Sequence, residues 1–457
     1  MKDQDIVGEA LAAVLPQHDK PWLRVPHLLK LNLILLVPLL SSAVAGYDGS
    51  LMNGLQSIPE WKRYFGNPTG SILGVVNAAQ SIGSVVSLPV VGWLSDRLGR
   101  RLTLLLGSLT IVASSAIQAA SVKYGMFVFS RVLVGVGSML VVQPAPMLIT
   151  ELAYPTHRGK YTRWLIANDR REEAEQLLAR FHTDGDVNHP LVQFEMSEII
   201  HTLSMEARAS QVPWSTLVKT PGNRKRTFIA ICVGAFAQWN GVAVVSYYLT
   251  LVLDTVGITD SDTQTLINGL LQVFNFIAAG SAALLVDRLG RRTLFLWSAA
   301  GMLVSFVIWT ACSAVFDTSQ AAPLGNTVIA FVFIFYFHYD IAYTPLLLGY
   351  PTEIFPYSIR SKGVTTTLLS VYSSLVILAF VNPIALENIG WHYYIFFCCF
   401  DLLVLSVTFF MFPETKGHSL EEIGQIFDGP SAGTGGLEVG KKDYDETITR
   451  EHAEYAG

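Results

Sequence analysis

Ten apolar stretches, each of roughly 20 residues or more, constrain this chain more than any other feature of its sequence. They lie at about 29–47, 68–93, 102–121, 125–149, 227–252, 263–286, 292–314, 326–349, 364–386 and 391–412. A helix needs about 20 apolar residues to cross the bilayer core, and unpaired backbone amides are not tolerated there. The sequence therefore predicts an all-α integral membrane protein with ten transmembrane helices.

Composition agrees with a membrane location. The chain is 51% hydrophobic and 15% charged, whereas soluble domains carry about 25% charged residues. The net charge of -5 is small and spread along the chain, so no nucleic-acid partner is expected. The four cysteines lie in apolar stretches without metal-ligand spacing, and no nucleophile or phosphate-loop constellation is present. The protein is therefore not expected to be an enzyme or to hold a metal or an organic cofactor.

Basic residues gather in alternate connecting loops. SDRLGRR follows the second span, THRGK the fourth, VDRLGRR the sixth and PYSIRSKG the eighth, while loops 253–262 and 315–325 carry no Lys or Arg. Because basic loops stay on the cytoplasmic side, both termini are predicted to be cytoplasmic.

The apolar pattern divides the chain into five parts. We expect a cytoplasmic segment at 1–28, a lobe of four spans at 29–159, a cytoplasmic helical linker at 160–226, a lobe of six spans at 227–412 and a cytoplasmic segment at 413–457. The linker contains the amphipathic stretches RREEAEQLLARF and VQFEMSEIIHTL. The Gly-rich, charged sequence after about residue 428 is expected to be disordered.

The two lobes contain a repeated motif. GWLSDRLGRR at 92–101 matches LLVDRLGRR at 284–292, each between the second and third spans of its lobe. Parallel repeats of this kind are typical of two-lobed transporters with a site near the midplane.

These motifs resemble those of the sugar porters of the major facilitator superfamily. Further matching residues are Arg131, Gly135, Gly137 and Pro146 on the fourth span, Glu151, Arg158 and Gly159 just after it, and Pro413 to Gly417 followed by Leu420, Glu421 and Glu422 after the last span. AQWNGVAVVSYYL and YDIAYTPLLLGYPTEIFP look most like fungal lactose-permease-type transporters. The resemblance implies a two-lobed helical bundle in the plasma membrane. It also implies a monomer, embedded in the lipid bilayer, that carries a mono- or disaccharide by proton symport.

Such porters have twelve spans, and the resemblance implies that the fifth and sixth are missing from this chain. Arg158 to Thr162 run straight into Arg163, Trp164 and Leu165, without the Pro-Glu-Ser-Pro that normally introduces the linker. A splice variant or a faulty gene model accounts for such a clean loss, and a functional ten-helix protein is the alternative. Losing an even number of spans preserves the orientation of every later helix.

Amide side chains within the spans suit a sugar, because they donate and accept hydrogen bonds at fixed geometry. By resemblance, Gln238 and Asn275 are predicted to contact the sugar, with Asn240, Gln272 and Tyr247 as further candidates. The alternative is that the amides join helices and that the tyrosine simply packs. Three family contact positions carry Ala237, Ala243 and Leu348, which leaves room for a larger sugar.

Three charged residues are candidates for proton coupling. In related symporters an acid matching Asp48 lies near the arginine matching Arg131, and its protonation releases that pair. Asp340 is a second intramembrane acid. The alternatives are that Asp48 caps a helix end and that Asp340 bonds a neighbouring helix.

A repeated set of charges is predicted to form a cytoplasmic gate. In the family such charges pair between helix ends and part as the inner gate opens. The members are Asp96, Arg100, Arg101, Glu151 and Arg158 in the first lobe and Asp287, Arg291, Arg292, Glu353 and Arg360 in the second. The alternative, that the arginines only fix topology, is compatible with this role.

Two functions fit these features. The first is a proton-coupled sugar transporter, or an inactive remnant of one. The second is a sugar sensor that binds without transport, although such receptors usually carry a longer cytoplasmic tail.

Overall fold

The computed structural model describes residue 29, residues 51–145 and 171–182, parts of 186–200, and residues 212–416 and 420–429. Eight segments of these are long and apolar enough to cross a membrane, and the last, Ser358–Met411, contains two long helices. Nine of the ten predicted spans therefore coincide with described helices. Apart from residue 29, the first predicted span lies outside the described residues. The predicted helical membrane fold is confirmed.

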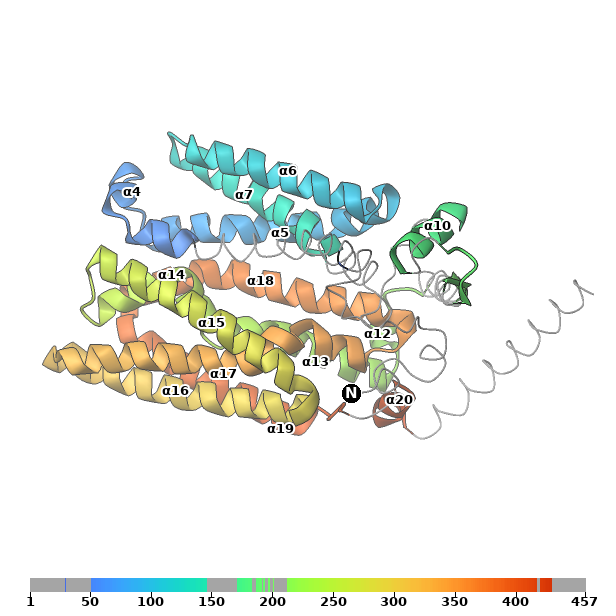
Figure 1. Cartoon of the computed structure of the whole chain (residues 1–457). Helices are drawn as coiled ribbons and strands as arrows, with labels where there is room; N and C mark the ends of the chain where they lie inside the picture. Colours follow the sequence, from blue (N-terminus) through green and yellow to red (C-terminus); the bar gives the residue numbers. More distant parts are fainter. Residues whose placement is uncertain are drawn as a thin grey trace, which may run out of the picture. The chain divides into compact units, whose positions relative to one another are not determined.

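The chain divides into two compact units, residues 1–211 with 375–384, and residues 212–374 with 385–457. The first contains α4 (Pro59–Tyr64), α5 (Gly70–Leu98), α6 (Arg100–Ala119), α7 (Tyr124–Val142) and the linker helix α10 (Arg171–His182). Helix α7 packs along both α5 and α6 (Figure 1). A Cβ on Gly135 would lie 2.0 Å from the carbonyl oxygen of Gln80, so only glycine permits this close approach of α7 to α5.

The second unit is a larger helical bundle. Its helices are α12 (Thr216–Lys219), α13 (Pro221–Trp239), α14 (Val242–Thr255), α15 (Ser261–Leu289), α16 (Arg291–Ser319), α17 (Ala322–Ile354), most of α18 (Tyr357–Ile389), η3 (Gly390–His392), α19 (Tyr393–Met411) and α20 (Leu420–Asp428). Helix α16 packs most extensively against α17 and also against α19, and α15 packs against α17 (Figure 1). Phe306 of α16 contacts both Phe335 of α17 and Phe397 of α19, so aromatic rings fill the interior.

The repeated motif forms the same turn in both units. Gly99 joins α5 to α6 with φ +83 and ψ 156, and Gly290 joins α15 to α16 with φ +90 and ψ 149. Side-chain-bearing residues rarely adopt this conformation, so the glycine is what allows each helix to end and the next to begin at once. The helices before the two turns are also equal in length, at 29 residues each.

One predicted span is interrupted. The sequence predicts one helix over 227–252, but the structure has two, α13 and α14, separated at Asn240 and Gly241. Gly241 has φ +95, and a second irregularity follows at Tyr248, with φ -137 and ψ 28. Asn240 is fully buried, and its side-chain oxygen accepts a hydrogen bond from the Val242 amide at 3.1 Å. The predicted span is present, but this glycine turn and side-chain bond replace regular helical hydrogen bonds and divide it into two helices.

Helix α13 begins within the segment predicted to be linker. Pro221 occupies its first turn, and the hydroxyl of Thr220 accepts a hydrogen bond from the Asn223 amide at 3.2 Å. Arg226 is 1% exposed and forms a 2.7 Å salt bridge with Asp428 of α20. Its Nε donates to the Ile354 carbonyl oxygen at 2.9 Å. These contacts tie α20 to the ends of α13 and α17.

Candidate functional site

The second unit has a charged network where α15, α16 and α17 end or begin. Arg291 at the start of α16 forms a 3.0 Å salt bridge with Glu353 near the end of α17. The other carboxylate oxygen of Glu353 accepts a hydrogen bond from the Thr415 hydroxyl at 2.5 Å. Both charged side chains are partly accessible, at 16% and 28% exposure, so the pair can form and part without a large desolvation cost.

Glu414 completes this network by capping α16. Its two oxygens accept hydrogen bonds from the amides of Arg291 at 2.8 Å and Arg292 at 3.1 Å. A helix N-terminus carries free amides and a partial positive charge, which together favour a carboxylate. Burial raises the pKa of Glu414, but backbone hydrogen bonds, led by the one from Lys416, outweigh burial and leave the pKa below its ordinary value. Glu414 is therefore ionised at neutral pH.

The structure brings together two of the five gate residues predicted in this unit, Arg291 and Glu353. Arg292 donates instead to the Phe409 carbonyl oxygen at 2.7 Å, and Arg360 donates to that of Phe355 at 3.3 Å. Asp287 lies in the last turn of α15, and its side chain is not described. The sequence analysis assigned no role to Glu414 or Thr415. The sequence feature that could have indicated them is the Pro-Glu-Thr run directly after the last span.

The gate residues of the first unit are described less fully. Asp96 lies near the end of α5 and Arg100 begins α6, but their side chains are not described. Arg101 has an exposed side chain. Glu151 and Arg158 lie outside the described residues, so the pairing predicted for this gate stays a prediction.

Arg131 lies buried in α7 and faces α5. Its side chain is 0% exposed, and Nη2 donates to Oε1 of Gln80 at 3.1 Å. The close approach at Gly135 brings the two helices near enough for this bond. Asp48, the predicted partner of Arg131, lies outside the described residues, so this pairing also stays a prediction.

The amides predicted to bind sugar lie on the interrupted span and on α15. Gln238 is 9% exposed, two residues before the break, and no hydrogen bond to its side chain is found among the described residues. Asn240 also contacts Met302, with its Nδ2 3.4 Å from the sulfur. Both ends of the Asn240 amide are therefore engaged within the protein, which favours the structural alternative for this residue.

Helix α15 carries a stripe of three half-buried amides, Asn268, Gln272 and Asn275. Their spacing of four and three residues places them on one helix face. The side-chain oxygens of Asn268 and Asn275 are buried without a hydrogen-bond partner among the described residues. The sequence analysis did not name Asn268 as a sugar-binding candidate, although it lies four residues before Gln272 and so shares its helix face. Buried amides without partners are suited to accept hydrogen bonds from a hydroxylated ligand.

Tyr247 and Asp340 lie close to a group of tyrosines. Asp340 is 5% exposed and accepts a hydrogen bond from the Thr344 hydroxyl at 2.7 Å, while its other oxygen has no partner among the described residues. Tyr336 and Tyr339 of α17 lie near Asp340 and near Tyr247 of α14. The hydrogen bond between Thr344 and Asp340 lies within α17 and does not reach a neighbouring helix, so both readings of Asp340 stay predictions.

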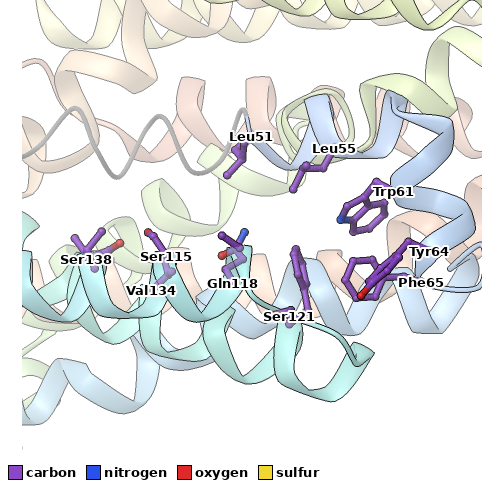
Figure 2. Close-up of a pocket in the computed structure, with 13 residues that line it drawn as sticks. Leu51, Leu55, Trp61, Tyr64, Phe65, Ser115, Gln118, Ser121, Val134 and Ser138 are labelled. Atoms are coloured by element: carbon purple, nitrogen blue, oxygen red, sulfur yellow. The ribbon is translucent and has the colours of Figure 1, made fainter.

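The first unit contains a separate cavity of about 510 Å³. Figure 2 shows Ser138 and Ser115 at one end and the rings of Trp61, Tyr64 and Phe65 at the other. Trp61 Nε1 and Ser138 Oγ are buried without partners among the described residues. The cavity contains none of the predicted sugar-binding residues. Its aromatic and hydroxyl lining suits an amphipathic molecule.

Comparison with known proteins gives one consistent result. Residues 34–163 and 161–427 match the model of a family described as "Sugar (and other) transporter". The high-affinity glucose transporter of Kluyveromyces lactis is 25% identical over 480 residues, covering 88% of this chain and 86% of that protein. The hexose transporter HXT10 of Saccharomyces cerevisiae is 24% identical over 461 residues, covering 84% and 83%.

Solved structures show the same fold. The inward open conformation of the xylose transporter XylE from E. coli is similar with a TM-score of 0.68, at 21% identity, covering 87% of this chain and 100% of that one. XylE bound to 6-bromo-6-deoxy-D-glucose is similar with a TM-score of 0.66, at 20% identity, covering 87% and 99%.

Proposed function

The chain belongs to the sugar (and other) transporter family, and on this premise we propose that it carries a mono- or disaccharide across the plasma membrane in symport with a proton. It is a multi-pass membrane protein rather than an enzyme. The proposed cycle is alternating access by a monomer in the lipid bilayer, with both termini in the cytoplasm.

The interrupted span carries this proposal. Discontinuous transmembrane helices form the substrate sites of many transporters, because a break exposes polar groups at the depth of the substrate. Here the break at Asn240 and Gly241 lies beside Gln238, an amide without a hydrogen-bond partner among the described residues. We assign Gln238, Gln272 and Asn275 to sugar binding, with Tyr247 as a further contact, and keep Asn240 as a residue that shapes the break.

The test is uptake of radiolabelled glucose, xylose and lactose in a host that lacks its own sugar transporters. Gln238→Ala is expected to raise KM by roughly fivefold, since one hydrogen bond to the sugar is worth about 1 kcal/mol. Gln425→Ala, an exposed glutamine on α20, is the matched control and should leave KM unchanged. A proton uncoupler should abolish accumulation. Absence of uptake of all three sugars despite surface expression would overturn the proposal.

We also propose that the chain is a shortened form of a twelve-span porter. The two matches to the family model, 34–163 and 161–427, meet at the place where the fifth and sixth spans are expected. Sequencing the gene and the transcript around Thr162 and Arg163 tests this. An omitted exon that encodes two apolar segments would support the proposal, and an uninterrupted locus would contradict it.

A further inference from the structure

The cavity of the first unit lies between α4, α6, α7 and residues 51–55, and it has no part in the proposed sugar site. Its volume of about 510 Å³ is within the range of small-molecule pockets, which is about 300–1,000 Å³. None of the described residues that line it is charged. An ionic ligand would be buried there without a counter-charge, so the cavity suits an uncharged one.

Packed groups frame both ends of the cavity, so its shape is set before a ligand binds. At one end the centroid of the Trp61 ring lies 5.4 Å from that of Phe65 and 5.7 Å from that of Phe127. At the other end α6 and α7 touch, since a Cβ on Gly137 would lie 2.8 Å from Cγ1 of the lining residue Ile111. A preformed cavity costs little free energy in reorganisation when a ligand enters.

The cavity is long and narrow. Phe127 at the aromatic end and Ser138 at the other end lie eleven residues apart on α7, which corresponds to about 16 Å at about 1.5 Å per residue. Figure 2 shows Trp61 and Ser138 at its two ends. Dividing the volume by this length gives a mean cross-section of about 30 Å². This space accommodates one elongated molecule.

A polar group is buried at each end of the cavity. Ser138 is 5% exposed, and neither its Oγ nor Nε1 of Trp61 has a hydrogen-bond partner among the described residues. Figure 2 shows the Trp61 nitrogen on the side of the ring toward Gln118, another lining residue. An indole N–H only donates and so needs an oxygen acceptor, whereas a serine hydroxyl donates or accepts. A ligand oxygen at each end would satisfy both groups.

Between the two ends the lining is mainly apolar. Leu51, Leu55 and Val134 contribute to it (Figure 2). The Ser121 hydroxyl is already used, because it donates to the Ile117 carbonyl oxygen at 2.8 Å. A free sugar carries hydroxyls around its whole ring, and most of them would be buried here without partners. The cavity therefore suits a molecule with an apolar body rather than a sugar.

The cavity opens along α6. Ser115 and Ala119 line it one turn apart, and both are exposed. Helix α6 is long and apolar enough to cross a membrane, and only 17% of its apolar part is buried. Exposed apolar surface of this kind marks contact with lipid in a membrane protein. A ligand that reaches the cavity past Ser115 and Ala119 therefore comes from the bilayer.

We propose that this cavity binds an elongated, uncharged, membrane-soluble lipid that carries an oxygen at each end, as a dioxygenated steroid does. One oxygen accepts a hydrogen bond from Nε1 of Trp61, the other bonds the Ser138 hydroxyl, and the apolar body lies along α7. The binding is non-covalent and independent of sugar transport.

Equilibrium binding of tritiated oestradiol, a rigid steroid with a hydroxyl at each end, tests the proposal. The purified full chain is placed in lipid nanodiscs without sugar, and uptake of the probe by empty nanodiscs is subtracted. Saturable binding of one probe per chain is expected. The same steroid without its second hydroxyl should bind about fivefold more weakly, as the loss of one hydrogen bond predicts. Absence of saturable binding would overturn the proposal.

Two conservative variants locate the site. Trp61→Phe keeps an aromatic ring in the cluster but removes the donor, and Ser138→Ala removes the hydroxyl, so each should weaken binding about fivefold. Trp214→Phe, at a tryptophan that is 56% exposed, is the matched control and should leave binding unchanged. Wild-type affinity in both cavity variants would overturn the assigned site.

Ser115→Trp provides a further readout, because it places a large side chain at an exposed position in the opening and should abolish binding without disturbing the interior. An excess of glucose, xylose or lactose should leave the probe bound. Displacement by any of these sugars would make the cavity part of the sugar site and overturn the proposal. The assay measures no transport, so a failure of the proposed function in uptake experiments would be recognised separately.

Discussion

The two Asp-Arg-Leu-Gly-Arg-Arg turns have the same sequence and nearly the same backbone, yet they differ in what surrounds them. At Gly290, Glu414 caps the helix that follows and Glu353 pairs with Arg291. At Gly99, Arg101 is exposed and no equivalent cap is found among the described residues. The motif therefore encodes the turn locally, whereas its charge pairing depends on distant segments.

The sequence indicates why the cap is found on one side. Pro413 and Glu414 directly follow the last span of the second lobe, but the Pro-Glu-Ser-Pro expected after the first lobe is absent from residues 160–165. Under the proposed loss of two spans, the segment that would supply a comparable carboxylate is absent. The following substitutions, from the largest expected effect to the smallest, test this difference between the two turns.

Gly290→Ala is expected to cost about 3 kcal/mol of stability, and Gly99→Ala about 1 to 2 kcal/mol. Both introduce a side chain at positive φ, but a Cβ at Gly290 would also lie 2.8 Å from Glu414 Oε2. Thermal unfolding of the detergent-solubilised protein measures both. Equal losses would show that Glu414 does not constrain the second turn.

Glu414→Ala is expected to cost about 1 to 2 kcal/mol, because it removes a charged acceptor from the free amides of α16. Glu387→Ala, at an exposed glutamate, is the control and should change stability little. Because the pKa of Glu414 is lowered in the folded state, its contribution is present above the unfolded value of about 4.3 and is lost as the pH falls through the folded value.

The stability difference between wild type and Glu414→Ala should therefore be constant from about pH 5 to 8 and shrink below about pH 4. Measuring unfolding midpoints across this range checks the sign. A difference that grows on acidification would contradict the assigned ionisation.

A double-mutant cycle of Arg291→Ala and Glu353→Ala should give a coupling of about 0.5 to 1 kcal/mol, as expected for a partly exposed pair. Added salt should weaken it, since the pair is accessible to ions. The same cycle with Arg101→Ala in place of Arg291→Ala should give no coupling. A coupling of similar size there would mean that both turns share one partner.

The smallest effect is expected at the residues that directly precede α5 and α15, the helices before the two turns. Asp260 caps α15 by accepting hydrogen bonds from the amide and the hydroxyl of Thr263, at 2.8 and 2.6 Å, whereas Thr69 makes no side-chain cap at α5. Asp260→Ala should lower the unfolding temperature slightly and Thr69→Ala should not. The reverse order would disprove the assigned caps.

Much of this fold is predictable from the sequence because length and apolar content alone identify a span. The break at Asn240 and Gly241 was not predicted, since hydropathy treats the segment as continuous, although Asn-Gly is a turn-favouring pair. The family resemblance predicted that charges pair between helix ends, but it did not specify that Arg291 pairs with Glu353. The cap by Glu414 depends on a contact between residues 123 positions apart, which no local pattern specifies. The sequence analysis did not single out Asp401, although it is an isolated acid in the apolar run that forms α19.

The salt bridge between buried Arg226 and the more accessible Asp428 has a practical consequence for shortening or tagging the chain. Asp428 lies directly before the Gly-rich sequence, which looks dispensable. It nevertheless neutralises Arg226, which is 1% exposed and lies near the start of α13. Trimming the chain before this residue would leave that cation unneutralised in the protein interior. Truncating the chain or attaching a tag after Gly429 retains the salt bridge between Arg226 and Asp428. Asp428 therefore sets the C-terminal limit for shortening the protein.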